Sequence, residues 1–208
     1  TCTVTQKAEQ KARRIIRLVL KKYQNAACLV TGCYAQLSHD ELLKMDPRII
    51  VLGGQIKSRL TKVPEVLNSF IKEKGWDALK FASFMNQKIT SAPQEKPGFP
   101  EESFKLAGTS FLAHSRASLK IQDGCNNNCS YCAIHMARGH SVSLDASLAI
   151  KRVQELEEKG NEEVVLTTVN IGQYKSEYEG KTVYFSDLLK LLLENTKTIS
   201  FRISSLYP

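Results

Sequence analysis

Long apolar runs are absent from this chain of 208 residues. None approaches the ~18 consecutive apolar residues that a membrane-spanning helix needs, and apolar runs such as residues 49–52 are the size of a strand. A basic-then-apolar secretion signal and internal repeats are also missing. Hydrophobic residues make up 42% and charged residues 24%, which excludes global disorder and a collagen-like chain. We therefore expect a globular, cytoplasmic protein with no membrane partner.

An initiator methionine is missing too, and the last residues follow directly on a strand-like run. Both ends resemble cuts through folded sequence, so we expect a piece of a longer protein. At typical domain sizes of about 100–200 residues, this length holds one large domain or two small ones.

The formal net charge of +8 is concentrated at the start of the chain. Residues 1–25 hold seven basic residues and one acidic residue, a net charge of +6, so the remainder contributes only +2. Such a segment can attract nucleic acid or another anionic surface. The alternative is a solvated helix face, because a run of charge usually serves solubility.

The first part of the chain alternates between strand-like and helix-like segments. Helical spacing of apolar residues predicts a helix over residues 6–22 with Thr5 as its N-cap. Ser38 followed by Glu41 is a capping-box signature for a short helix to residue 45. The other elements predicted here are strands at 26–31 and 48–52 and a helix at 63–74. This alternation predicts an α/β layer with a mostly parallel sheet.

A stretch rich in Pro, Gly, Gln and Lys then interrupts the pattern. Its composition is typical of a linker, so we predict an N-terminal domain over 1–84, a linker over 85–110 and a second domain over 111–208. The elements predicted in the second domain are strands at 117–122, 163–168 and 198–204 and helices at 145–159 and 186–194. A glycine-containing loop separates the second strand from the second helix. This order begins either a (β/α) barrel or a doubly wound sheet.

Three cysteines, Cys125, Cys129 and Cys132, are spaced C-x3-C-x2-C in a loop directly after a predicted strand. The glycine and asparagines around them tolerate the positive φ angles that a tight loop around a metal centre needs. Three thiolates can hold three irons of a [4Fe–4S] cube and leave the fourth iron open for a cofactor.

Other interpretations of these cysteines remain. Disulfides are disfavoured by the missing secretion signal and by the tightness of the loop. Three unliganded packing cysteines within eight residues would be unusually dense. Structural zinc stays open on spacing alone, because His135 would complete a Cys3His set.

Residues 120–132 resemble the cluster loop of the radical S-adenosylmethionine methylthiotransferases, and within them the MtaB type that acts on tRNA. Further stretches with the same resemblance occur in family order at 1–5, 31–36, 169–172 and 202–205. This collinearity favours an iron–sulfur cluster over zinc. The implied fold is a parallel α/β methylthiotransferase domain followed by the first part of a radical S-adenosylmethionine (β/α) barrel.

The resemblance also implies an activity. Enzymes of the MtaB type add a methylthio group to carbon 2 of N6-threonylcarbamoyladenosine at position 37 of tRNA, using S-adenosylmethionine and two [4Fe–4S] clusters. A tRNA substrate and an electron donor such as a flavodoxin or ferredoxin are the implied partners. The alternatives within the family act on isopentenyladenosine in tRNA or on an aspartate of a ribosomal protein. The alternative outside it is a zinc-stabilised RNA-binding module without catalysis.

By this resemblance Cys125, Cys129 and Cys132 are the ligands of the radical cluster. Tyr131 would contact the adenine of the cofactor, whereas its ordinary role would be packing beneath the loop. No catalytic acid or base is identified by the resemblance.

Cys2 and Cys33 match two of three ligands of the auxiliary cluster, and the first ligand would lie upstream of Thr1. Without the family they would be ordinary buried cysteines. Cys28, inside an apolar strand, matches no ligand and is expected in the core. We expect the isolated segment to lack a stable auxiliary cluster and to be inactive.

Asn170 and Arg138 are further candidates for the cofactor and substrate cavity, because they follow a strand end and the cluster helix. The alternative for each is a solvated loop residue. Around the loop the sequence departs from the family pattern at His135, Met136, His140, Val142 and Thr168.

Overall fold

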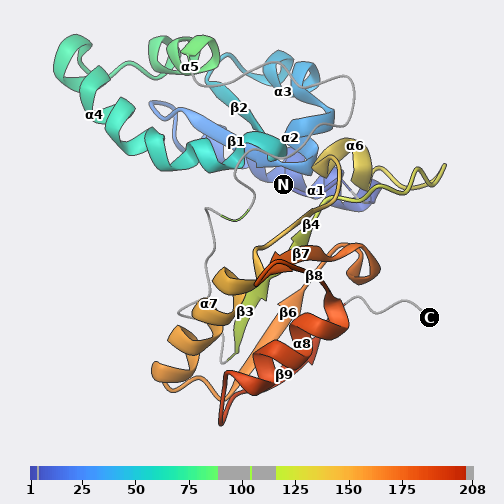
Figure 1. Cartoon of the computed structure of the whole chain (residues 1–208). Coiled ribbons are helices and arrows are strands. Elements are labelled where there is room, and N and C mark those ends of the chain that lie inside the picture. Colours follow the sequence, from blue (N-terminus) through green and yellow to red (C-terminus); the bar gives the residue numbers. More distant parts are fainter. Residues whose placement is uncertain (4, 89–103, 105–115, 205–208) are drawn as a thin grey trace. The chain divides into compact units, whose positions relative to one another are not determined.

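The computed structural model describes residues 1–3, 5–88, 104 and 116–204 (Figure 1). The chain forms two compact units. The first comprises Thr1–Glu102 with Asn128–Gly139, and the second comprises Ser103–Asn127 with His140–Pro208. Most of the predicted linker lies outside the described residues. In the described part, no helix is long and apolar enough to cross a membrane.

Two parallel strands form the centre of the first unit. β1 (Cys28–Gly32) pairs with β2 (Ile49–Gly53), so that both strands end at the same edge. The described helical segments around them are α1 (Gln6–Lys22), α2 (Cys33–Leu37), α3 (His39–Met45), η1 (Gly54–Lys62), α4 (Val63–Lys74), α5 (Ala78–Lys88) and α6 (Ile134–Arg138). The predicted α/β layer with a parallel sheet is confirmed.

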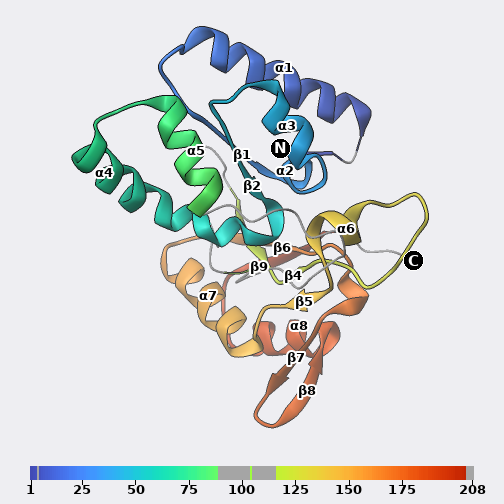
Figure 2. The ribbon, with the colours of Figure 1, turned by 90° about the horizontal axis from the view of Figure 1, so that it is seen from above.

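Helices cover both faces of this sheet (Figure 2). Successive strand residues point to opposite faces, and all of β2 is buried. Ile49 and Val51 pack in one cluster with α1 and α3, whereas Ile50 packs in another with α4 and α5. Burying such a side chain contributes about 1.5–3 kcal/mol, so the two helical layers stabilise β2 from both sides.

The predicted cap of α1 is present, but the predicted capping box of α3 is not. Thr5 accepts a hydrogen bond from the backbone N–H of Ala8 (3.1 Å). Ser38 does stand at the N-cap of α3, yet its side chain makes no capping hydrogen bond. The carboxylate of Glu41 instead accepts from the Arg13 guanidinium (3.2 Å), which joins α3 to α1.

Helix α5, which the sequence pattern does not predict, occupies Ala78–Lys88. Asp77 caps its start by accepting from the backbone N–H of Lys80 (3.0 Å). Phe81 and Met85 lie one turn apart and are buried against β2 and α4. The helix therefore continues through residues 85–88, the first residues of the predicted linker.

The second unit contains a parallel sheet of three strands, in the order β3 (Ala117–Lys120), β6 (Glu163–Thr167) and β9 (Ser200–Ile203). The connecting helices are α7 (Ala146–Glu158) and α8 (Phe185–Glu194). Each new strand adds next to the preceding one, and α7 contacts α8. Both helices therefore cover the same face, which is the arrangement that opens a (β/α) barrel.

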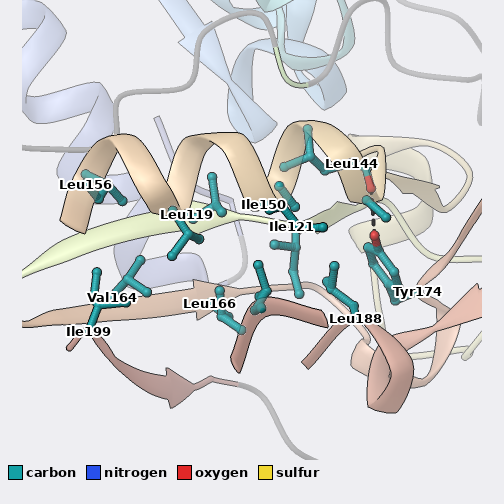
Figure 3. Packing of buried hydrophobic residues seen from close by; sticks show 14 of the residues in the cluster. Leu119, Ile121, Leu144, Ile150, Leu156, Val164, Leu166, Tyr174, Leu188 and Ile199 are labelled. Carbon is teal, nitrogen blue, oxygen red and sulfur yellow. Dashed lines mark hydrogen bonds between the residues drawn. The ribbon is translucent and has the colours of Figure 1, made fainter. Parts of the chain in front are cut away.

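The core of this unit lies between the sheet and its helices (Figure 3). Leu119, Leu166 and Leu188 are fully buried there. Tyr174 closes one end of the core, where its hydroxyl donates to the carbonyl of Leu144 (2.8 Å). Burial raises the pKa of Tyr174 to about 12, so the phenol remains protonated and keeps this donor at neutral pH.

The predicted strand over 117–122 is interrupted. Ile121 still donates through its backbone N–H to the carbonyl of Thr167 in β6 (3.0 Å), but the next residues form a separate strand. This strand, β4 (Gln122–Asp123), pairs antiparallel with β5 (Val142–Ser143). The predicted loop after β6 contains the short η2 (Ile171–Gln173) and a hairpin of β7 (Lys175–Tyr178) and β8 (Lys181–Tyr184). Its two turn residues, Glu179 and Gly180, both have positive φ, as a tight hairpin turn requires.

Glu157, near the end of α7, anchors the segment before β9. Its carboxylate accepts from the backbone N–H groups of Thr198 and Lys197, which lowers its pKa to about 2. Because the folded pKa lies below the ordinary value of 4.5, this stabilisation is present above pH 4.5 and is lost as the pH falls through about 2.

We therefore expect Glu157→Gln to lower the melting temperature at pH 7. The difference in melting temperature between the variant and the wild type should narrow progressively below about pH 4.5, because protonation then removes the stabilising effect of the wild-type carboxylate. Thermal unfolding followed by circular dichroism between pH 7 and pH 3 measures it. A difference that stays constant over this range would contradict an ionic anchor.

Candidate cysteine site

The cysteine loop begins where β4 of the second unit ends. Asp123 accepts from the backbone N–H of Gly124 (2.9 Å) and from the Lys120 ammonium (2.7 Å). Gly124 has a φ of 70°, which only glycine adopts readily, and it turns the chain toward Cys125. The positive φ that the composition predicted for this loop is thus present at Gly124.

A buried glutamine, Gln122, fixes the base of this loop. Its amide oxygen accepts from the backbone N–H groups of Val169 and Asn170 (2.9 Å each), which follow β6. Its amide nitrogen donates to the carbonyl of Gly124 (2.8 Å) and to the hydroxyl of Ser141 (2.8 Å). Gln122 is fully buried, so these bonds form away from water and join the loop to the end of β6.

Gln173 contacts the loop directly. Its amide nitrogen lies 3.7 Å from Cys125 Sγ and donates to Asn127 Oδ1 (3.0 Å). Its amide oxygen accepts from the backbone N–H of Asn126 (2.9 Å). Neither Gln122 nor Gln173 is among the site residues predicted from the sequence. The position of Gln122, a polar residue directly after the apolar residues of a predicted strand, is a sequence signal for its role.

The other two cysteines of the spacing, Cys129 and Cys132, belong to the segment Asn128–Gly139 of the first unit. The backbone N–H of Cys132 donates to the carbonyl of Cys129 (3.0 Å) and closes a tight turn before α6. All three cysteines are free and partly exposed. Within the described ranges, no three His, Cys, Asp or Glu side chains are grouped as a metal site.

Tyr131, between the last two cysteines, is 91% exposed. The ring therefore does not pack beneath the loop, which was the ordinary role considered for it. His135, the fourth ligand of the zinc alternative, lies in α6. Its Nδ1 is buried and has no hydrogen-bond partner among the described residues.

The two remaining candidates fall in different units. Asn170 follows β6 and caps η2 by accepting from the backbone N–H of Gly172 (3.2 Å). Its own backbone N–H binds Gln122, so this residue is tied to the base of the cysteine loop. Arg138 is the exposed last residue of α6 in the first unit.

A second cysteine pair, Cys2 and Cys33, lies near the carboxyl end of β1. Thr1 donates through its hydroxyl to the carbonyl of Thr31 (2.8 Å). A Cβ on Gly32 would lie 2.4 Å from the Thr1 carbonyl oxygen, so glycine permits this close approach. The chain start therefore packs against the residue that precedes Cys33. Cys2 is exposed, which excludes the ordinary buried role for it.

Unpaired polar atoms lie in the same unit. The side-chain oxygens Gln55 Oε1, Ser58 Oγ and Thr31 Oγ1 are buried and have no partner among the described residues. Gln55 follows β2, as Cys33 follows β1, and ligand sites of parallel sheets gather at such strand ends. Cys28, by contrast, is half-buried within β1, and burial raises the pKa of its thiol.

Helix α1 carries the basic excess of the sequence. Arg13 is paired with Glu41 and Glu9. The exposed cations that form no salt bridge within the described part of the chain are Lys7, Lys11, Arg14, Arg17, Lys21 and Lys22.

Comparison with known proteins matches both halves of the chain. The model of "Uncharacterized protein family UPF0004" matches residues 1–54, and that of the "Radical SAM superfamily" matches residues 119–205. The threonylcarbamoyladenosine tRNA methylthiotransferase MtaB of Treponema pallidum is 39% identical over 248 residues, covering 100% of this chain and 51% of that protein. The chain is similar over its whole length to the radical S-adenosylmethionine methylthiotransferases.

Other members of the family are also similar. The MtaB protein of Bacillus subtilis is 32% identical, with 99% of this chain and 42% of that protein covered. The ribosomal protein uS12 methylthiotransferase RimO of Caldicellulosiruptor saccharolyticus is 31% identical, with 100% of this chain and 44% of that protein covered. The chain thus spans about half the length of the curated relatives it matches.

Similarity to this family implies [4Fe–4S] clusters and S-adenosylmethionine as cofactors. The donor set of the loop is compatible with such a cluster, because it offers three free thiols within eight residues and no carboxylate between them.

Proposed function

We propose that the protein containing this chain adds a methylthio group to carbon 2 of N6-threonylcarbamoyladenosine at position 37 of tRNA. One observation carries the proposal: the C-x3-C-x2-C loop follows β4 in a chain that aligns over its whole length with a relative named for this activity. The RimO likeness supports the shared methylthiotransferase chemistry.

In this proposal Cys125, Cys129 and Cys132 hold the radical cluster. Three protein thiolates leave one iron for S-adenosylmethionine. When bound, the cofactors supply the radical that an inert aromatic C–H bond requires. The chain's own contribution is to hold Cys125, through Gln173 and the Gln122 anchor, beside the loop that follows β6.

We assign contacts with the cofactor or substrate to Tyr131, Arg138 and Asn170. The exposed ring of Tyr131 is available for stacking on an adenine. Asn170 follows a central strand of the sheet, and residues at the carboxyl ends of barrel strands face the site. Arg138 offers a charge that pairs with a carboxylate or phosphate.

Cys2 and Cys33 are proposed ligands of the auxiliary cluster. The packing of Thr1 on Gly32 supports this assignment, because it brings the chain start to the strand end that precedes Cys33. The proposed domain arrangement is the methylthiotransferase domain at 1–84, a linker at 85–110 and the radical domain at 111–208.

The proposed partners are tRNA and a small electron donor of the flavodoxin or ferredoxin class, and the proposed location is the cytoplasm. The exposed cations of α1 that form no salt bridge among the described residues support a polyanionic partner, since each phosphate contact releases counterions and favours binding. The first 25 residues carry a formal net charge of +6, because Glu9 is their one acidic residue.

Mass analysis of tRNA nucleosides from cells that lack the full-length gene tests the function. We expect the methylthio derivative of threonylcarbamoyladenosine to disappear and threonylcarbamoyladenosine to accumulate. Complementation with the wild-type gene and with a Cys28→Ser control should restore the derivative.

Two results would overturn the substrate assignment. Unchanged methylthio-threonylcarbamoyladenosine would exclude it. Loss of the methylthio derivative of isopentenyladenosine, or of the modification on ribosomal protein uS12, would transfer the activity to another branch of the family.

A further inference from the structure

The side chain of Gln173, which lies outside the cysteine loop, contacts three consecutive residues of that loop. The bonds run to Cys125 Sγ (3.7 Å), to the backbone N–H of Asn126 (2.9 Å) and to Asn127 Oδ1 (3.0 Å). Gln173 is 48 positions from Cys125 in the chain, so these are tertiary contacts between η2 and the start of the loop.

The hydrogen bonds fix which end of the Gln173 amide faces the cysteine. A backbone N–H can only donate, so the atom that receives the Asn126 N–H is the amide oxygen. The NH2 group then points toward Cys125 and Asn127. Each of its two hydrogens has an acceptor, and a flipped amide would place two donors against each other.

The backbone of Gln173 is held as well. Its N–H donates to the carbonyl of Asn170 (3.0 Å). The next residue, Tyr174, is fully buried and is anchored by its bond to the carbonyl of Leu144 (Figure 3). The amide is therefore presented to the loop by a fixed segment, which keeps the donor in place when the loop binds a ligand.

We propose that Gln173 is a positioning residue that donates a hydrogen bond to the Cys125 sulfur and thereby raises the reduction potential of the cluster that this cysteine binds. The inference rests on the proposed function, since it takes Cys125 as a cluster ligand. An N–H donor withdraws negative charge from a thiolate. The reduced cluster, which carries one more electron, gains more from this than the oxidised cluster.

The test uses the full-length protein, anaerobically reconstituted, in a Cys33→Ser background that removes the second candidate cluster. Three variants are compared with this parent. Gln173→Leu removes donor and acceptor at similar volume. Gln173→Glu keeps an acceptor for Asn126 but replaces the donor by a carboxylate oxygen. Gln154→Leu is the matched control, because Gln154 donates to the carbonyl of Asn195 (3.1 Å) rather than to the loop.

Iron content and visible absorbance are measured first, and the midpoint potential is then titrated with dithionite and followed by electron paramagnetic resonance. We expect a more negative potential for Gln173→Leu, a still more negative one for Gln173→Glu, and no change for Gln154→Leu. If Gln173→Leu does not retain iron, the potential of Gln173→Glu tests the inference instead. This variant keeps an oxygen that accepts from the backbone N–H of Asn126.

Unchanged potentials in iron-loaded Gln173→Leu and Gln173→Glu would overturn the inference. A parent protein that binds no iron at all would instead refute the cluster assignment of the proposed function. The two failures are thus distinguished before any variant is titrated.

Discussion

Replacement of Cys129 by alanine should abolish the iron–sulfur absorbance that we expect near 400 nm in the reconstituted full-length protein, with a loss of about four irons per chain. A cube held by three thiolates cannot be retained by two, because the exposed iron then exchanges its remaining ligands with water. Cys125→Ala and Cys132→Ala should give the same loss. Methylthio transfer should fall below detection in all three variants, since the radical requires the cluster.

The matched control for this series is Cys28→Ala. Cys28 is half-buried in β1, where burial raises the pKa of its thiol and keeps it a neutral packing group. We expect full iron content and a decrease in unfolding free energy of about 1 kcal/mol. Two results would contradict the assignment: full iron in Cys129→Ala, or one zinc per chain and no visible absorbance in the parent.

The sequence predicted the α/β class because its strongest signals are local. The helix over 6–22 follows from the helical spacing of its apolar residues. Of the residues that carry this prediction, Ala12 and Ile16 are buried in the structure, whereas Ile15 is exposed. The helix over 63–74 has a proline in its first turn and ends at Gly75, as predicted. These features depend on neighbouring residues alone, so no tertiary information was needed.

The missed elements depend on partners that are distant in the chain. Helix α5 is short, and its apolar face is recognisable only once Phe81 meets Phe70 of α4, with ring centroids 5.2 Å apart. The β7–β8 hairpin is mostly polar and turns at Glu179, a residue that rarely adopts positive φ. Neither segment carries the usual pattern of its element.

The same limit applies to the candidate site. The spacing predicted the three thiols, because the ligands of a cluster loop lie within a few residues of one another in the sequence. Gln122 and Gln173 were missed because their roles come from contacts made 47 and 48 positions away. Only the folded unit shows that the residues after β6 and the cysteine loop share hydrogen bonds.

The second large effect concerns Gln122, which we expect to be the most sensitive polar residue of the second unit. Gln122→Leu preserves much of the volume but removes the acceptor for the N–H groups of Val169 and Asn170 and the donor to the Gly124 carbonyl. Leaving buried backbone groups unpaired costs about 1–3 kcal/mol each, so the unfolding free energy should fall by roughly 3–5 kcal/mol if part of the loop relaxes toward water.

Urea unfolding of the cluster-free protein at pH 7 measures this loss, with Gln154→Leu as a control expected within about 0.5 kcal/mol of the parent. Gln122→Glu separates the two halves of the amide, because it keeps the acceptor for Val169 and Asn170 but cannot donate to Gly124 when ionised. A cost under about 1 kcal/mol for Gln122→Leu would show that the loop base is held by other contacts. The predicted cost together with reduced iron retention would mean that one amide couples the stability of the barrel strand β6 to the cysteine loop.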